Sequence, residues 1–220
     1  MFLFFECLAA VFLSALAYVY IVYKLKKEKG EEAKLLSLEY DKFSVITSIT
    51  IGIVSVVSVL VMRLYREKPL EEVFIYLLLL IFFLVSAVID WKAKIIPNEV
   101  ILAGLAFFVI AVLLRVFVSR TVFLAVIYNA ILGGLIIGGV LLLIALLVKS
   151  ALGMGDVKMF FVAGLFLGYI NAYFLVFATV VIMAIFSIVL LITKKADRKT
   201  AIPMAPFTAV AFLFCIFIGM

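Results

Sequence analysis

The chain contains no histidine, and only 15% of its 220 residues are charged. Without histidine there is no serine–histidine or cysteine–histidine nucleophile pair, no H-E-x-x-H zinc site and no imidazole proton carrier. Any chemistry on this chain must therefore use carboxylates, lysines, hydroxyls or backbone groups. We expect neither a metal nor another cofactor.

Cysteine is almost as scarce. The two cysteines, Cys7 and Cys215, lie in apolar segments and form no C-x-x-C pattern. Such residues are typical of small buried side chains, and we prefer that interpretation. Because both fall near the outer face in the topology derived below, a disulfide between them stays open.

What the chain has in abundance is apolar surface. Hydrophobic residues make up 69% of it and the mean hydropathy is +1.43, values that predict a membrane-embedded protein. The net charge of +6 comes from basic residues that flank apolar runs. Such residues set topology and meet anionic lipid, so we do not expect nucleic acid as a partner.

The apolar runs predict an all-α, polytopic membrane helix bundle in a single domain, residues 1–220. A span needs about 20 apolar residues. We expect residues 2–23 to be a retained first span and residues 24–42 a short cytoplasmic loop. The tract 159–192 exceeds one span, and we break it at Gly168–Asn171, which leaves the sixth segment short. The eight predicted helices are 2–23, 43–62, 73–89, 99–118, 121–148, 157–169, 171–192 and 202–220.

Positive charge orients this bundle. With the N-terminus outside, fourteen basic residues fall in inner loops and five in outer loops. Cytoplasmic loops carry the excess of lysine and arginine in membrane proteins. The segmentation therefore places both Asp90 and Asp156 at the cytoplasmic face. The five outer residues are Arg63, Arg66, Lys68, Arg115 and Arg120.

Two G-x-x-x-G patterns, Gly134–Gly138 and Gly164–Gly168, occur in predicted helices. Small residues at this spacing let helix backbones approach closely. We prefer packing within this bundle over dimerisation.

Asp90 and Asp156 are the candidate chemical groups. Alone, Asp90 beside Trp91 is typical of a membrane interface. Asp156 follows Gly153 and Gly155, which free the backbone for close contacts near the membrane surface. Two carboxylates held together share a proton and supply both the acid and the base for peptide hydrolysis. Which aspartate carries the proton stays open.

Three motifs resemble those of the type IV prepilin peptidases, which are membrane aspartyl proteases of the G-x-G-D type. They are Ile-Asp-Trp-Lys-Ala-Lys-Ile-Ile-Pro-Asn at 89–98, Gly-Met-Gly-Asp-Val-Lys at 153–158 and Ile-Pro-Met-Ala-Pro-Phe at 202–207. They stand in the family's order and cover the chain from about residue 73 to its end. The resemblance implies that Asp90 and Asp156 are catalytic.

The remaining site positions are assigned more loosely. Gly153, Gly155 and Lys158 belong to the active-site loop, although Lys158 also fits an ordinary interfacial lysine. Supporting positions are Pro97, Asn98, Pro203 and Pro206.

The resemblance also implies the reaction. Such enzymes cut the short basic leader from prepilins, pseudopilins or preflagellin-like precursors at the cytoplasmic face of the cell membrane. Larger members add a cysteine-containing cytoplasmic domain linked to N-methylation. Residues 24–42 replace that domain and contain no cysteine, so we expect a peptidase-only variant.

Two alternatives were weighed. The presenilin and signal-peptide-peptidase group also uses G-x-G-D, but pairs it with Tyr-Asp on the preceding helix and Pro-Ala-Leu in a later one. Here Ile89 precedes Asp90 and the late motif is Met-Ala-Pro. A proton- or cation-coupled transporter would use Asp90 and Asp156 for ion binding. Transporters usually place such carboxylates near the midplane and often show internal repeats. The sequence shows neither feature.

Overall fold

The computed structural model describes residues 2–28, 42–118, 123–148, 152–194 and 202–219. Within these ranges the regular structure is helical and no strand occurs. A π-helical turn, η1, continues the second helix into the loop before the third. The elements are α1 (Phe2–Glu28), α2 (Lys42–Leu60), η1 (Val61–Tyr65), α3 (Leu70–Ala93), α4 (Asn98–Val118), α5 (Phe123–Leu147), α6 (Met154–Ile192) and α7 (Ala205–Ile218).

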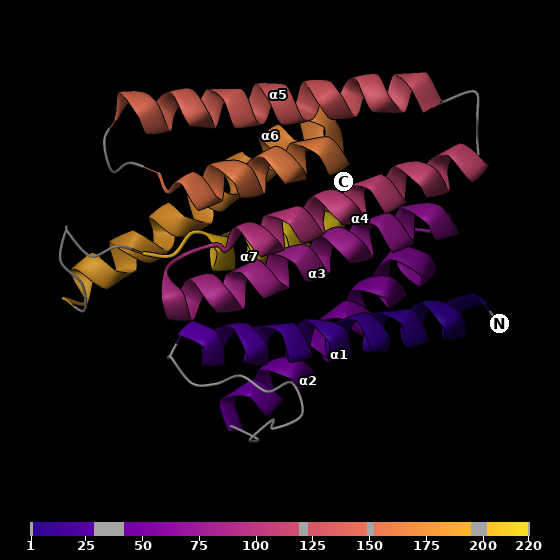
Figure 1. Cartoon of the computed structure of the whole chain (residues 1–220), viewed down its shortest axis with the longest axis horizontal. Coiled ribbons are helices and arrows are strands. Elements are labelled where there is room, and N and C mark those ends of the chain that lie inside the picture. The colour runs from indigo at the N-terminus through magenta and orange to yellow at the C-terminus, as the bar shows by residue number, and fades with distance from the viewer. Residues whose placement is uncertain (1, 29–41, 119–122, 149–151, 195–201, 220) are drawn as a thin grey trace.

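Five of the described helices are long and apolar enough to cross a membrane: α1, α3, α4, α5 and α6. Two shorter apolar segments accompany them, Ile49–Tyr65 and Ala205–Ile218. The helices run lengthwise side by side (Figure 1). The predicted all-α membrane helix bundle is therefore confirmed.

The prediction of eight separate segments is not reproduced. Residues 157–169 and 171–192 are assigned to a single element, α6, but its backbone is non-helical at Gly168 (φ 72°, ψ 177°), which lies within the predicted break at 168–171. A backbone of this kind is accessible essentially only to glycine, and helical turns resume directly after it without a loop. Both ends of α6 lie at the left of Figure 1, so the chain reverses at the interruption.

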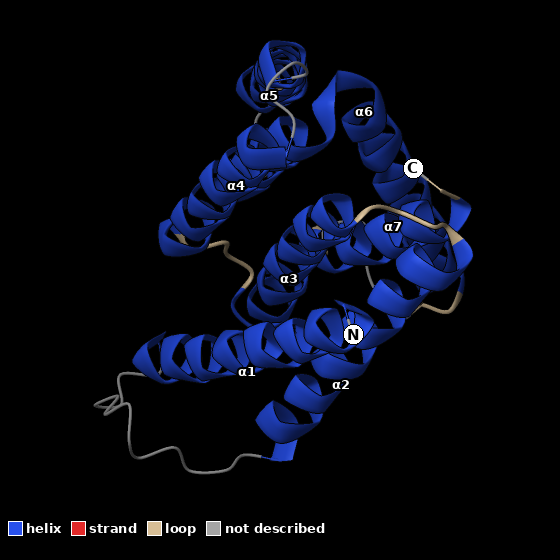
Figure 2. Ribbon diagram, turned by 90° about the vertical axis from the view of Figure 1, so that its right-hand side faces the viewer, coloured by secondary structure: helices blue, strands red, loops and turns tan. Residues whose placement is uncertain are grey.

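Helix α3 occupies the centre of the bundle, as the view along the helices in Figure 2 shows. Its run Leu77–Phe83 is buried on every side. A helix that is apolar all round is stable only when other helices surround it. Phe83 packs edge-on against Phe212 of α7 at a centroid distance of 5.2 Å. This central position fixes the end of α3, where Asp90 lies.

Helix α5 lies at the edge of the bundle and packs along the first half of α6 (Figures 1 and 2). Gly133 and Gly164 face each other so closely that a Cβ on either would fall on the carbonyl oxygen of the other. Gly134 and Gly138 leave room for the side chains of Leu165 and Phe161. The preferred prediction for the glycine patterns, packing within the chain, is confirmed. The patterns did not include Gly133.

Both described cysteines are free. Cys7 is half-buried and Cys215 is buried. The structure therefore contains no disulfide between them, in agreement with the preferred interpretation.

Candidate active site

Asp90 lies near the C-terminal end of α3 and is only 6% exposed. The helix ends four residues later at Lys94, whose left-handed conformation (φ 54°) lets its amide donate to the Asp90 carbonyl at 2.9 Å. The sequence predicts that the third span ends at residue 89, but α3 continues to Ala93, so Asp90 lies inside the helix. Its side chain is thus held by a rigid element.

The start of α7 supplies the hydrogen-bond partner of the Asp90 carboxylate. The backbone N–H of Ala205 donates to Asp90 Oδ2 at 3.0 Å, and the amide of Met204 also interacts with this carboxylate. The first amides of a helix have no partner within the helix, and the positive end of the helix dipole attracts an anion. Burial of Asp90 is therefore compensated by two backbone amides.

The two prolines of the third motif explain why α7 begins here. Pro206 lies in the first turn of α7, where proline is favoured because its missing N–H would be unpaired in any case. Pro203 precedes the helix start and is half-exposed. Neither proline contributes a polar group to Asp90. They position the amides of Met204 and Ala205, which do.

Asp156 lies in the first turn of α6. Gly153 is the N-cap residue (φ −71°, ψ 140°), and its backbone amide interacts with the Asp156 carboxylate. This contact is half of a capping box, in which an acid at the third helical position reaches back to the N-cap amide. The other oxygen, Asp156 Oδ1, is buried and has no hydrogen-bond partner among the described residues.

The fold brings the two aspartates into electrostatic contact, since the charge of Asp90 acts on Asp156. None of the ion pairs among the described residues involves either carboxylate. Two carboxylates that face each other without a cation cannot both ionise easily and share a proton. Such a pair can donate and accept a proton at the same place.

Gly155 brings the start of α6 against the loop between α3 and α4. A Cβ at Gly155 would lie 3.0 Å from Cβ of Ile96. Pro97, the next residue, is buried, and its carbonyl accepts the amide of Val100 at 3.1 Å at the start of α4. This glycine allows the close approach by which the first turn of α6, which carries Asp156, packs against the loop that follows α3.

Two polar contacts fasten α4 beside the site. Lys158 donates to Asn98 Oδ1 at 2.8 Å, and Lys24 of α1 pairs with Glu99 at 3.2 Å. Lys158 is thus bonded to another predicted site residue. It takes part in none of the ion pairs among the described residues. Both contacts are exposed, so they position the helix starts and add little stability.

The sequence prediction missed the amides of Met204 and Ala205, the contact of Ile96 and the pairing of Lys24 with Glu99. For the amides a signal was present, because Pro203 and Pro206 mark a helix start and a helix start offers free N–H groups. No local pattern indicates that Ile96 opposes Gly155. Among the described residues, no group of three or more potential metal ligands occurs.

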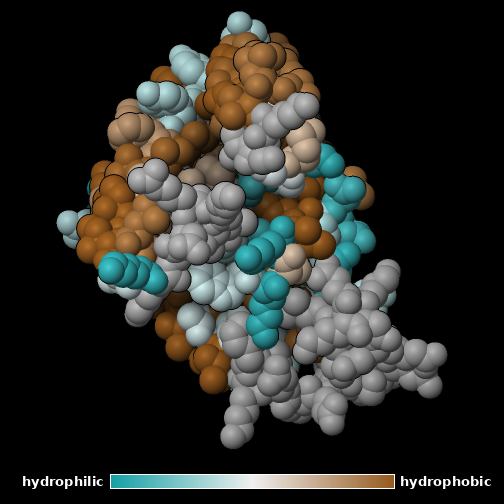
Figure 3. Space-filling model, turned by 90° about the vertical axis from the view of Figure 1, so that its left-hand side faces the viewer, coloured by the Kyte–Doolittle hydropathy of each residue, from teal (hydrophilic) through white to brown (hydrophobic). Residues whose placement is uncertain are grey.

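Figure 3 views the end of the bundle that carries these residues. Hydrophilic side chains gather near its centre, and the flanks of the helices around it are apolar. The site is therefore at the polar end of a structure whose sides suit lipid.

Fold and site together define a multi-pass membrane protein with paired carboxylates at one end of its helix bundle. The family model of the type IV leader peptidases matches residues 77–188, just over half of the chain, and the chain belongs to this family of peptidases. The match includes Asp90 and Asp156. Comparison with curated proteins and with solved structures gave no match.

Proposed function

We propose that this peptidase is an aspartic endopeptidase that uses Asp90 and Asp156 to remove short basic leaders from prepilin, pseudopilin or preflagellin-like precursors. The observation that carries the proposal is the convergence of two carboxylates from separate helices, each bonded to a backbone amide and neither in an ion pair among the described residues. Membership of the leader peptidase family supports the substrate class.

Hydrolysis needs both protonation states of the pair. One carboxylate takes a proton from water as the water oxygen attacks the carbonyl carbon of the scissile bond. The protonated partner gives its proton to the carbonyl oxygen, which forms a tetrahedral diol. The diol then collapses, the C–N bond breaks and the leaving nitrogen takes a proton from the pair. Asp156 Oδ1, which is buried and has no hydrogen-bond partner among the described residues, is the acceptor that we assign to the attacking water.

The placement of the aspartates favours this reaction over ion transport. Asp90 lies in the last turn of α3 and Asp156 in the first turn of α6, so both are near helix ends rather than at mid-span. We place this end at the cytoplasmic face, as the lysine distribution predicts. A leader peptide, which precedes the hydrophobic helix of its precursor, would meet the site there without entering the bilayer.

The test is cleavage of a prepilin-type precursor by the purified protein in lipid, with Asp90→Asn and Asp156→Asn as variants. Asparagine keeps the size but removes the proton chemistry, so each variant should lose at least about a hundredfold in kcat/KM. Glu72→Gln, which removes a carboxylate at the far end of α3, is the matched control and should cut normally.

Circular dichroism and thermal melting would show whether the variants are folded. Normal cleavage by either folded variant would contradict the assignment of the pair. Failure of the wild-type protein on all three precursor classes would contradict the substrate class.

A further inference from the structure

A cavity lies far from the aspartates, among α3, α4, α5 and α6. Its volume is about 190 Å³, whereas a water needs only about 10–15 Å³. Tyr76, on the cavity wall, precedes Asp90 by fourteen positions in α3, which is about 20 Å along the helix. The cavity is therefore separate from the proposed catalytic pair and lies toward the opposite end of the bundle.

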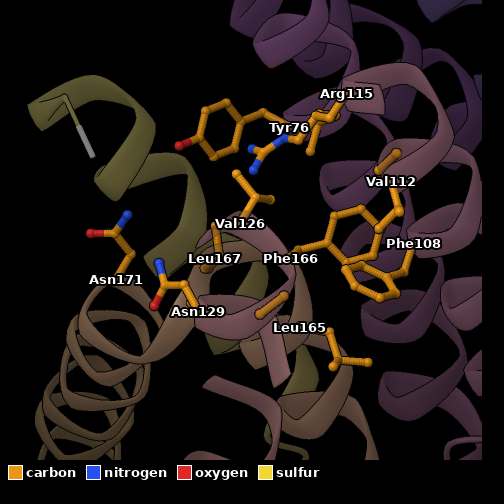
Figure 4. A pocket seen from close by; sticks show the side chains of 14 residues that line it. Tyr76, Phe108, Val112, Arg115, Val126, Asn129, Leu165, Phe166, Leu167 and Asn171 are labelled. Carbon is orange, nitrogen blue, oxygen red and sulfur yellow. The ribbon is translucent and has the colours of Figure 1, made fainter. Parts of the chain in front are cut away.

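Four polar side chains line this cavity, one from each helix: Tyr76, Arg115, Asn129 and Asn171. In Figure 4 the Arg115 guanidinium lies beside the Tyr76 side chain, and both extend toward the side on which the two asparagines lie. Among the described residues, no hydrogen bond or ion pair involves the side chains of Arg115, Asn129 or Asn171. Their donors are thus available to a ligand.

The other described arginines are used within the protein. Arg63 pairs with Glu6 at 3.1 Å, and Arg66 donates to the carbonyl of Phe217. The charge of Glu72 acts on Tyr76 at the cavity wall, but this carboxylate is already paired with Lys68 at 2.9 Å. Among the described residues that line the cavity, none is acidic and Arg115 is the one that carries a charge. Its guanidinium is a fork that matches the oxygens of a phosphate.

The apolar part of the lining suits the rest of a lipid. Phe108 and Phe166 stack edge-on at 5.6 Å and line the cavity together with Val112 and Leu165. Arg115 lies at the end of the apolar span Asn98–Val116, a depth at which lipid headgroups meet their chains. The second half of α6 begins at Gly168, so the positive end of its dipole also faces this region.

We infer that this cavity binds the phosphate of an anionic phospholipid, with Arg115 as the main contact and the two asparagines and Tyr76 as further hydrogen-bond partners. A lipid fits better than a soluble anion because nine of the fourteen lining residues are apolar and the cavity lies at the edge of a membrane span. An anionic headgroup fits better than phosphatidylcholine because no acid among the described residues lines the cavity to balance a choline.

The experiment is native mass spectrometry of the detergent-purified protein titrated with phosphatidylglycerol, phosphatidylcholine or diacylglycerol of the same acyl chains. We expect one phosphatidylglycerol to bind at least about tenfold more tightly than either other lipid. A tenfold difference corresponds to about one hydrogen bond to a charged group. Arg115→Gln should abolish this preference, and Arg115→Lys should retain part of it because the charge remains.

Two further variants separate a site from general attraction. Val126→Phe fills the cavity while leaving Arg115 in place, and it should also abolish the preference. Arg66→Gln removes a cation outside the cavity and should bind the lipid like the wild-type protein. If Arg66→Gln lost the preference for phosphatidylglycerol as fully as Arg115→Gln, or if Val126→Phe kept it, the cavity would not be the lipid-binding site. Displacement of the lipid by an equal concentration of inorganic phosphate would overturn the lipid as its ligand.

Discussion

At the residue scale, small differences in side-chain volume decide whether Asp156 can reach Asp90. Gly153 leaves space for Asp156 itself, since a Cβ at Gly153 would lie 2.9 Å from Asp156 Oδ2. Gly155 leaves space for Ile96 in the loop that follows α3. The two glycines of the G-x-G-D motif therefore have separate tasks. One accommodates the carboxylate of Asp156, and the other accommodates Ile96 in the opposing loop.

Gly155→Ala should reduce cleavage without unfolding the protein. A Cβ 3.0 Å from Cβ of Ile96 moves the start of α6 by a fraction of an ångström, and displacement of a catalytic group by about 1 Å can cost a hundredfold. We expect kcat to fall about tenfold or more, with a melting temperature near that of the wild-type protein. Ile96→Ala in the same chain should restore part of the activity because it removes the opposing atoms.

Gly139→Ala is the control for this substitution. No atom lies within 4 Å of the position that its Cβ would take, so activity should be unchanged. The melting temperature should stay level or rise slightly, since alanine favours a helix by up to about 1 kcal/mol over glycine. A Gly155→Ala variant that cut as fast as Gly139→Ala would show that the contact with Ile96 does not position Asp156.

At the scale of elements, α6 acts as a helical hairpin with a single glycine at its turn. Its first half packs on α5 through Gly133 and Gly164, and its second half reaches α7, where Phe186 contacts Phe207 at 5.1 Å. Both ends of α6 therefore lie at the end of the bundle that carries the aspartates. The first half begins there with Asp156, and the second half contacts α7, whose first amides bond to Asp90. The reversal at Gly168 is what allows both.

Gly168→Ala should destabilise the protein by about 1–3 kcal/mol, the cost of a residue in a backbone conformation that side chains avoid. The added Cβ would also lie 2.6 Å from the Asn129 amide nitrogen. Chemical or thermal unfolding in detergent measures the loss, with Gly139→Ala as the tolerated glycine substitution. Stability equal to the wild-type protein would mean that the reversal does not depend on this glycine.

At the scale of the whole molecule, the site belongs to the end of the bundle where Lys24 pairs with Glu99 and Lys158 bonds to Asn98. Helix α3 has 24 residues and is about 36 Å long, enough to cross a hydrocarbon core of about 30 Å. Its two ends should therefore face opposite compartments, with Asp90 on the cytoplasmic side.

Cysteine labelling at the two ends of α3 tests this orientation. Glu67 (φ 52°) and Lys94 (φ 54°) are both exposed and share a left-handed conformation, so Glu67→Cys and Lys94→Cys form a matched pair. In intact cells carrying a chain with Cys7→Ala and Cys215→Ala, a membrane-impermeant maleimide should label only Glu67→Cys. Lys94→Cys should react after the membrane is opened. The reverse pattern would place the catalytic pair outside.

The sequence by itself determined that this is a helical membrane protein and which two carboxylates to examine. Hydropathy is sufficient for the first conclusion because the bilayer imposes span length and internal hydrogen bonding on every segment. Asp90 and Asp156 stood out because charges beside apolar runs are uncommon and their motifs are local in the chain. The helix start marked by Pro203 and Pro206 was predictable for the same reason.

Only the tertiary structure decided what these residues contact. Ala205 donates to a carboxylate 115 positions earlier, and Gly133 opposes Gly164 although no motif names it. Such pairs depend on how helices that are apolar on every side rotate and slide against one another, and periodicity carries no information about that in these sequences. The cavity at Arg115 depends in the same way on four helices at once, so the residues that line it share no local pattern.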